Sequence, residues 1–271
     1  VRDDQNWKRI HDEYKNKYRV NSGGVNSPPI NLVYGYVETA IPRIYFRDPH
    51  MSINPKGGQS VMGASIIELS IGYIFRELNL KLQVLRVLKD AFLVGHGWLK
   101  FGYIGTMGQT EGETPDDVSE YIKDEEVFVS YVPYEDVVFD VTLSQDPPHE
   151  CRWLAHRIIR PLADVKSDPK YTNTGRLRGN VSVRDSRGEK IDDTIKDSDL
   201  DLFEYWEVHD KDTNSIYVVC DGTDKYLRET PNTYDMNGFA FSMLKFNSVP
   251  GEPYPLSDIY IIEAQILERV K

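Results

Sequence analysis

A long run of apolar residues with helical spacing constrains the fold of this chain more than any other feature. The apolar positions recur in steps of three and four, close to the repeat of about 3.6 residues in an α-helix. They are Ile67, Ile71, Ile74, Leu78, Leu82, Leu85, Leu88 and Phe92. A continuous helix from Gln59 to Val94 would be about 54 Å long. We therefore expect one long helix with a buried apolar face, ended by Gly95-His96-Gly97.

After Gly97 the pattern changes to a period of two, rich in aromatic and β-branched residues, which is typical of β-strands. The predicted strands are WLKFGYI (98–104), EVFVSYV (126–132), VVFDV (137–141), RWLAHRII (152–159), LFEYWEV (202–208), SIYVVC (215–220) and FAFSMLKF (239–246). Asp221-Gly222 is typical of a turn between antiparallel strands. The fold class we expect is α+β, in which a long buried helix and smaller helices pack with a mostly antiparallel sheet or partly closed barrel.

Shorter helices are predicted nearer the two ends of the chain. Residues 6–18 place aromatic and apolar side chains at helical spacing, which predicts a first amphipathic helix. Residues 31–41 predict a second helix that Asn31 opens and Pro42 ends. A last helix is expected from about Ser257. It stops in full helical periodicity at the last residue, and the first residue is not Met, so we expect the chain to be a fragment.

The segment from 172 to 199 differs from the rest in composition. It follows a short helical stretch that Pro161 begins, and it is rich in Asp, Arg, Asn, Ser and Gly. Few apolar side chains are present to offset the entropy cost of ordering, so we expect a mobile surface loop. The expected organisation is a domain over residues 1–255, helical over 1–97 and β-rich over 98–250, followed by a helix over 256–271.

The charge balance limits the classes of partner. The chain has 32 Lys and Arg against 43 Asp and Glu, a net charge of −11, which argues against a tight hold on duplex DNA through a broad basic face. Loose handling of DNA remains possible, since an acidic channel wall avoids salt-dependent adhesion to phosphate. The alternative is that the negative charge only keeps the protein soluble. No uncharged apolar run of about 18 residues occurs, so no membrane segment is expected. Cys151 and Cys220 make no disulfide scaffold, which favours a reducing, intracellular origin.

Acidic clusters are the first candidates for catalysis, because a metal-dependent nuclease needs carboxylates that converge on one or two cations. The candidates are Asp116-Asp117, Asp124-Glu125-Glu126, Asp192-Asp193 and Asp197, Asp199 and Asp201. All lie in polar, turn-rich surroundings, where solvated loop charge is the usual explanation. We therefore expect no catalytic residues, no metal site and no cofactor.

Other motifs have similarly plain interpretations. His149 and Cys151 are two residues apart, and Cys220 is distant, so no second pair at zinc spacing accompanies them. His96 has no Ser or Cys nucleophile motif beside it and is interpreted as a turn residue. Gly95-His96-Gly97 begins like a nucleotide-binding loop, but position 100 is Lys and the glycines follow a helix, whereas the dinucleotide motif follows a strand.

Four longer patterns follow one another along the chain. They are NLVYGYVETAIPRIYFRDPHMSINP, LKDAFLVGHGWLKFGY, VPYEDVVFDVTLSQDPPHECRWLAHR and PGEPYPLSDIYIIEAQILERV. Each is weak alone, but in this order and spacing they resemble portal proteins of tailed bacteriophages over nearly the whole chain. The resemblance implies a structural subunit of a ring of about twelve copies at one capsid vertex. The chain would cover the region called the wing and the start of the stem, without the clip, the returning stem helix, the tunnel loop or the crown.

The resemblance also implies where such a protein acts and what it meets. A portal ring forms the channel for viral DNA packaging and ejection, so non-specific double-stranded DNA passes through it. Its other implied partners are the major capsid protein, the large terminase and a tail adaptor, with no membrane involved. The implied location is the portal vertex of the virion, after assembly in the cytoplasm of the bacterial host. The packaging ATPase would be a separate protein.

The last helix is the predicted subunit contact. Ser257 and Asp258 suit the start of a helix, and four apolar residues recur at steps of three and four: Ile259, Ile262, Ile266 and Val270. We expect this stripe to begin the stem and to pack between subunits; packing on the chain's own wing is the alternative.

Two other functions remain open at this stage. One is another virion assembly protein, such as a neck adaptor or a minor capsid component. The other is a nucleic-acid-processing enzyme that uses the acidic clusters. A ring with an axial hole in negative-stain images favours the portal, whereas divalent-metal-dependent cleavage of DNA favours the enzyme.

Overall fold

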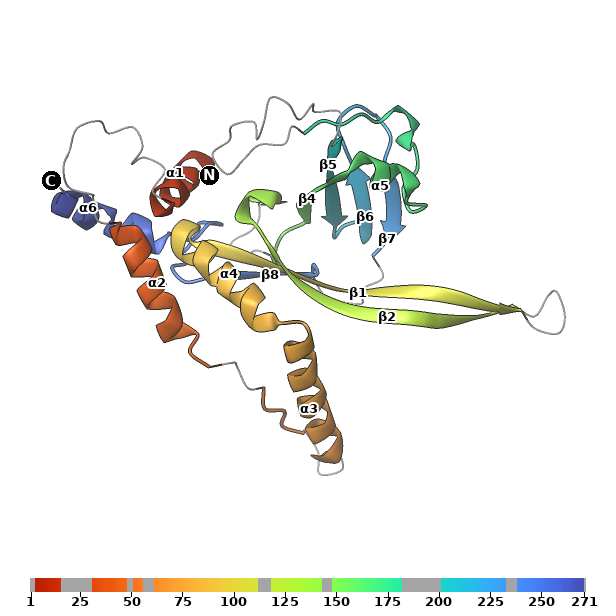
Figure 1. Cartoon of the computed structure of the whole chain (residues 1–271), viewed down its shortest axis with the longest axis horizontal. Coiled ribbons are helices and arrows are strands. Elements are labelled where there is room, and N and C mark those ends of the chain that lie inside the picture. Colours follow the sequence, from red (N-terminus) through yellow and green to blue (C-terminus); the bar gives the residue numbers. More distant parts are fainter. Residues whose placement is uncertain are drawn as a thin grey trace.

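The computed structural model describes residues 3–15, 31–47, 51–55, 61–111, 118–142, 148–181, 201–232 and 238–270, without the side chains of 106–124, 264 and 266–270. Most helices gather at one end of the molecule, and a five-stranded sheet lies toward the other (Figure 1). A long pair of strands runs outward from between them. The chain is therefore α+β, as predicted.

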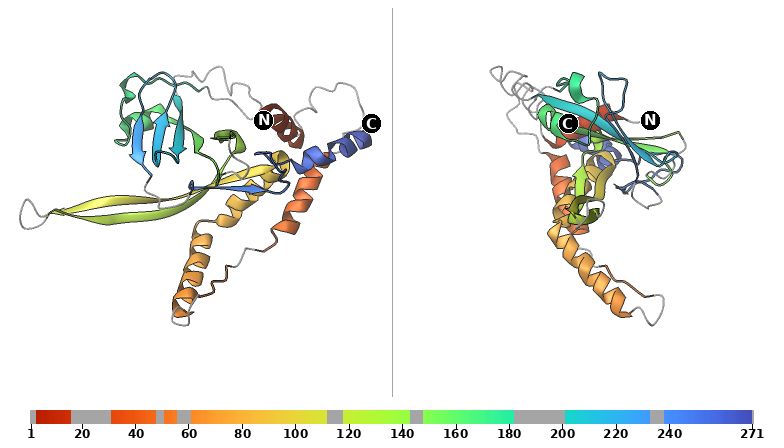
Figure 2. Two further views of the ribbon diagram at one scale, coloured as in Figure 1. Left: turned by 180° about the vertical axis from the view of Figure 1, so that it is seen from behind. Right: turned by 90° about the vertical axis from the view of Figure 1, so that its right-hand side faces the viewer.

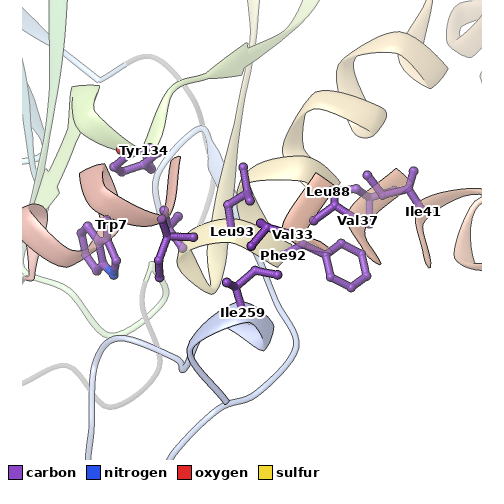
Figure 3. Close-up of a cluster of buried hydrophobic side chains, with 11 residues drawn as sticks. Trp7, Val33, Val37, Ile41, Leu88, Phe92, Leu93, Tyr134 and Ile259 are labelled. Carbon is purple, nitrogen blue, oxygen red and sulfur yellow. The ribbon is translucent and has the colours of Figure 1, made fainter. Parts of the chain in front are cut away.

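Four helices form the helical end. They are α1 (Asp4–Tyr14), α2 (Leu32–Ile44), α4 (Leu80–Val94) and α6 (Asp258–Val270). Asp3 caps α1, and Asn31 caps α2 by accepting a 2.9 Å bond from Tyr34 N, which confirms the predicted start of α2. Residues 16–18 of the predicted first helix lie outside the described residues. The core that the helices share, with Tyr134 of the 3-10 helix η3 (Tyr134–Asp136), is drawn in Figure 3: Trp7, Ile10, Val33, Val37, Ile41, Leu88, Phe92, Leu93, Val94, Tyr134 and Ile259.

The prediction of one long buried helix is wrong in two respects. The helix breaks after Glu77, so that α3 (Val61–Glu77) and α4 are separate and point in different directions (Figure 1). The break lies at Asn79, whose φ of 48° and ψ of 44° are left-handed, a conformation that Asn tolerates better than most residues. The face is also buried only in its second half: Leu88 is 3% exposed, whereas Ile67 is 51% exposed. Periodicity identifies apolar positions but not what covers them.

Two predicted helix ends have different outcomes. Gly95 ends α4 with a φ of 95°, as expected. A Cβ on Gly95 would lie 2.7 Å from the carbonyl oxygen of Pro255, so the glycine also allows a close approach of the backbone. Pro42, in contrast, does not end α2, which continues to Ile44. Proline removes only its own N–H donor, and Tyr45 N still bonds to the carbonyl of Ile41 at 2.9 Å.

Sheet A has the strand order β2-β1-β8, all antiparallel. Its strands are β1 (His96–Glu111), β2 (Val118–Val132) and β8 (Phe241–Lys245). Its buried residues pack with neighbouring segments into a second core, built of Trp98, Val132, Val137, Phe139, Cys151, Leu154, Phe239 and Phe241. β1 runs directly on from α4, which places the sheet against the helical end.

Sheet B has the order β3-β4-β5-β6-β7, also antiparallel. Its strands are β3 (Val137–Phe139), β4 (Trp153–Pro161), β5 (Leu202–Asp210), β6 (Ser215–Val219) and β7 (Arg228–Pro231). One side carries α5 (Leu162–Ser167) and a third core of Leu162, Val165, Leu177, Phe203, Tyr205, Val218 and Leu227. Neither sheet closes on itself among the described strands, so of the two expected arrangements the antiparallel sheet is formed and the partly closed barrel is not.

The first part of the predicted loop 172–199 packs against sheet B. Thr172 N bonds to the carbonyl of Leu227 at 2.7 Å, Leu177 is buried, and Asn180 accepts from Glu204 N at 2.7 Å. Residues 182–200 lie outside the described residues. Among the helices that the structure describes, none has both the length and the apolar character needed to cross a lipid bilayer.

Candidate assembly surfaces

Helix α3 exposes an apolar stripe on its outer face. Met62, Ile66, Leu69 and Tyr73 follow each other at steps of four, three and four residues, which places them on one side of the helix. All four are exposed, Met62 at 78% and Leu69 at 74%. This spacing is typical of one helix that packs on another. In the single chain the stripe faces solvent.

An apolar groove lies beside this stripe, between α3 and the chain that leaves α2. Leu69, Ile71 and Phe75 line it from α3, and Tyr45 and Met51 line it from the other side. The groove has a volume of about 510 Å³. Leu69 belongs to both features, so the stripe and the groove form one continuous apolar surface.

Charged side chains also line this groove, which we call the α3 groove. Arg76 and Lys81 line it near the break between α3 and α4, and both are exposed. Glu68 also lines it, and one of its carboxylate oxygens lies 3.4 Å from the backbone nitrogen of Ile53. The groove therefore has a largely apolar lining that also carries two positive charges and one negative charge.

A second extension is the outer part of the β1–β2 pair, residues 101–111 and 118–129, which we call the arm. β8 pairs with β1 from His96 to Lys100, and Phe101 N still bonds to the carbonyl of Ala240 at 3.0 Å. Beyond Phe101 the described partner of β1 is β2, as far as the pair Glu111 and Val118. Figure 2 shows the arm leaving the body in a direction different from that of α3. Tyr103, Ile104 and Val127 are exposed on it. An isolated two-stranded ribbon is at best marginally stable in water, so the arm needs a covering surface.

The predicted stem residues divide into two groups. Ser257 caps α6 as expected, since its Oγ accepts from the backbone N–H groups of Ile259 and Tyr260. Ile259 is 1% exposed and lies in the chain's own helical core, and Ile262 packs partly against that core. Ile259 therefore contributes to the interior of the single chain. The side chains of Ile266 and Val270 lie outside the described ones, and their role as a subunit contact stays a prediction.

A buried polar cluster joins the two sheets. Lys100 of β1 donates to Glu207 of β5 at 2.6 Å, and Arg228 of β7 lies 3.3 Å from the other oxygen of that carboxylate. His209 Nε2 is 2.9 Å from Glu207, and His156 Nδ1 is 3.4 Å from Lys100. Sequence reasoning missed this cluster, because its residues are far apart in the chain and each stands in a strand of otherwise ordinary composition.

The electrostatics of the cluster follow from burial and close pairing. Burial alone would raise the pKa of Glu207, but the hydrogen bond from His209 and the charge of Lys100 hold that pKa well below its usual range. Burial, with Lys100 close by, lowers the pKa of His156 to about 4, so its ring is neutral at pH 7 and accepts from Lys100. The cluster thus surrounds the carboxylate of Glu207 with several hydrogen-bond donors and links sheet A to sheet B.

The described candidate residues do not gather at one place. Asp116-Asp117, Asp192-Asp193, Asp197 and Asp199 lie outside the described residues, as does the side chain of Asp124, whereas Glu125, Glu126 and Asp201 are exposed. Cys151 is buried in the second core, His149 is exposed, and Cys220 packs beside the third core. Within the described part of the chain, no group of three or more His, Cys, Asp or Glu could hold a metal ion.

His96 is not the turn residue that the sequence suggested. It is the first residue of β1 and is buried, with its ring 4.8 Å from that of Trp7 and 5.5 Å from that of Tyr254. Gly97 lies against α4, where a Cβ would collide with the backbone of Val87. Gly95-His96-Gly97 is therefore a tightly packed junction between helix and sheet. Comparison of the sequence with models of known protein families and with curated proteins found no match.

Proposed function

We propose that this chain is a structural subunit of a portal ring at one vertex of a bacteriophage capsid. In this role it forms part of the channel for packaging and ejection of viral DNA, and it docks the terminase and the tail adaptors. The observation that carries the proposal is the pair of uncovered extensions, α3 and the arm. The four sequence patterns that resemble portal proteins supply the specific class.

Exposed apolar surface of this kind supports an assembly role. Soluble monomers rarely leave large contiguous apolar patches in water, and such patches commonly mark interaction sites. Here the stripe of Met62, Ile66, Leu69 and Tyr73 adjoins the α3 groove. The arm is a second uncovered surface on a different side of the molecule (Figure 2). A ring needs two such surfaces on each subunit, because every copy meets two neighbours through different faces.

The charge of the chain suits a conduit. With a net charge of −11 it does not attract phosphate over its whole surface, so DNA could pass without the strong, salt-dependent adhesion that Lys and Arg contacts create. In this proposal the ring acts by its geometry and carries no catalytic residues. Capsid, terminase and adaptor contacts would lie on surfaces of the assembled ring.

Self-association of the chain tests the proposal. We expect the protein to form a large oligomer in sedimentation velocity, and Leu69→Asp/Tyr73→Asp to remain folded but to lose most of that oligomer, because two charges enter an apolar interface. The matched control is Ile159→Asp/Tyr226→Asp, which places the same charge on two other exposed residues, Ile159 of β4 and Tyr226 just before β7, and should assemble normally. A native protein that stays monomeric at high concentration would contradict the proposal.

A further inference from the structure

We infer that the arm of one copy of this chain lies in the α3 groove of the next copy. The inference rests on the proposed function, and it identifies the two surfaces that meet when subunits associate. Three observations carry it: the charges of the two surfaces, their apolar side chains, and the directions in which they project.

The two surfaces carry opposite charge. Between Tyr103 and Val127 the sequence has eight Asp or Glu and a single Lys, and Glu125 and Glu126 are exposed on the arm. Among the residues that line the groove, Arg76 and Lys81 are positive and Glu68 is negative. The lining is thus net positive, in a chain whose net charge is −11. Complementary patches of this kind steer association and fix its register.

The two surfaces also match in their apolar content. On one face of the arm, the cross-strand partners Tyr103 and Val127 are exposed, and the groove presents Leu69 and Met51. Covering these side chains removes apolar area from water on both partners. Helix α3 of a neighbouring copy would also support the arm, because a two-stranded ribbon is only marginally stable on its own. Apolar contact at the centre with charges around it is the common anatomy of a protein interface.

The dimensions and directions of the two elements favour contact between copies. The eleven residues of β1 from Phe101 to Glu111 reach about 36 Å beyond the part of the strand that β8 covers. Helix α3 is about 25 Å long. In Figures 1 and 2 the arm and α3 of one chain diverge from the body. Since the arm is one surface and the groove another, the contact is head-to-tail, which is the kind that forms a ring when the rotation between copies closes.

Charge reversal tests the contact directly. The arm variant is Glu125→Lys/Glu126→Lys, and the groove variant is Arg76→Glu/Lys81→Glu. Each places like charges opposite each other, so each alone should raise the concentration of half-assembly at least about tenfold. The matched controls are Glu229→Lys/Glu252→Lys and Arg178→Glu/Lys225→Glu, which change the net charge equally at exposed positions outside both surfaces. Circular dichroism and the denaturation midpoint show whether each variant folds.

Combination of the variants distinguishes direct contact from a general effect of charge. An equimolar mixture of arm and groove variants should regain assembly, because the reversed arm fits the reversed groove and the native arm fits the native groove. One chain with all four substitutions should also assemble. The readout is the mass distribution in sedimentation velocity at low ionic strength, where such charges are least screened.

Each outcome separates this inference from the proposed function. If the native chain never assembles, the proposed function fails. If the native chain and the arm variant assemble equally well, the arm does not carry the contact, and the inference is overturned while the ring proposal stands. If each variant loses assembly but the mixture does not regain it, the arm and the groove meet different partners, which also overturns the inference.

Discussion

The ammonium group of Lys100 lies 2.6 Å from the carboxylate of Glu207, and this contact ties sheet A to sheet B. Both side chains are largely buried, so the pair exchanges little with solvent. Lys100 also lies over the ring of Phe241, 5.4 Å from its centre. The arm continues from the strand that carries Lys100, and the position of the arm relative to sheet B therefore depends on this pair.

Loss of Lys100 should be costly. Lys100→Met removes one partner of a buried pair and leaves Glu207 undercompensated, which should lower the free energy of unfolding by about 3 kcal/mol. Lys100→Met/Glu207→Gln should recover part of that loss, because the uncompensated charge is gone. Arg152→Ala, which breaks the solvent-exposed pair with Asp212, should leave the denaturation midpoint unchanged. A Lys100→Met midpoint equal to that of Arg152→Ala would show that the buried pair does not hold the sheets together.

The two halves of the predicted long helix should respond differently to truncation. Leu88→Ala removes a buried side chain from the helical core and should cost about 3 kcal/mol. Ile67→Ala lies on exposed α3 and should change stability by less than about 0.5 kcal/mol. Urea denaturation should be measured at a concentration that keeps the chain monomeric, since assembly adds stability. Equal losses would place both halves in the core, contrary to the structure.

Asp90 should make stability fall as the pH rises through neutrality. It is buried in α4 and accepts a 2.6 Å bond from the hydroxyl of Tyr131. Burial raises the pKa of Asp90 to about 7, despite hydrogen bonds from Tyr131 and from the backbone of Tyr134 that lower it. The folded chain therefore holds a proton that the unfolded chain releases near pH 4. The stabilisation is complete below about pH 4, decreases as the pH rises from there, and is lost once the pH has risen through 7.

The measurement is the free energy of unfolding at pH 6 and at pH 8. The native chain should lose about 1 kcal/mol between these values from this group. Asp90→Asn cannot ionise and should lack that part of the dependence. The other charged group that faces this site is Glu135, and Lys15 acts on it more weakly, so Glu135→Gln is the control and should keep most of the dependence. Identical pH profiles for the native chain and Asp90→Asn would exclude this explanation.

DNA cleavage should be absent. The exposed acids Glu125, Glu126 and Asp201 do not form a group with other ligands in the described part of the chain. Incubation with plasmid DNA and Mg²⁺ or Mn²⁺ should leave the plasmid intact in gel electrophoresis. Turnover that depends on the metal and disappears in Asp192→Ala/Asp193→Ala would contradict the structural role.

Local signals in the sequence predicted much of the fold. Three helix boundaries follow from properties of single residues. A side-chain oxygen caps the helix at Asn31 and at Ser257, and Gly95 ends a helix because glycine tolerates a positive φ. Alternating apolar residues predicted all or part of the described strands other than β7. β7 was missed, because Arg-Glu-Thr-Pro shows no apolar alternation and pairs with β6 through its backbone. The outer arm was missed for the same reason, since β1 continues past Ile104 through polar residues.

The assembly surfaces needed the three-dimensional structure. The break at Asn79 gives no clear signal, because Asn occurs within helices as well as in left-handed turns. Once the helix breaks there, half of an apolar run that the sequence assigns to the core faces solvent. The opposite happened in α6, where Ile259 of the expected contact stripe lies in the interior. Apolar periodicity alone does not distinguish a core from an interface, since both bury the same side chains.

Negative-stain electron microscopy of the protein tests the central claim most directly. The account predicts closed rings with an axial hole and rotational symmetry, in which each copy contributes one arm and one α3 groove to its neighbours. The arm variant Glu125→Lys/Glu126→Lys should give isolated particles on the same grids. Isolated particles from the native protein at every concentration, or open filaments without closure, would contradict the assignment of this chain as a ring subunit.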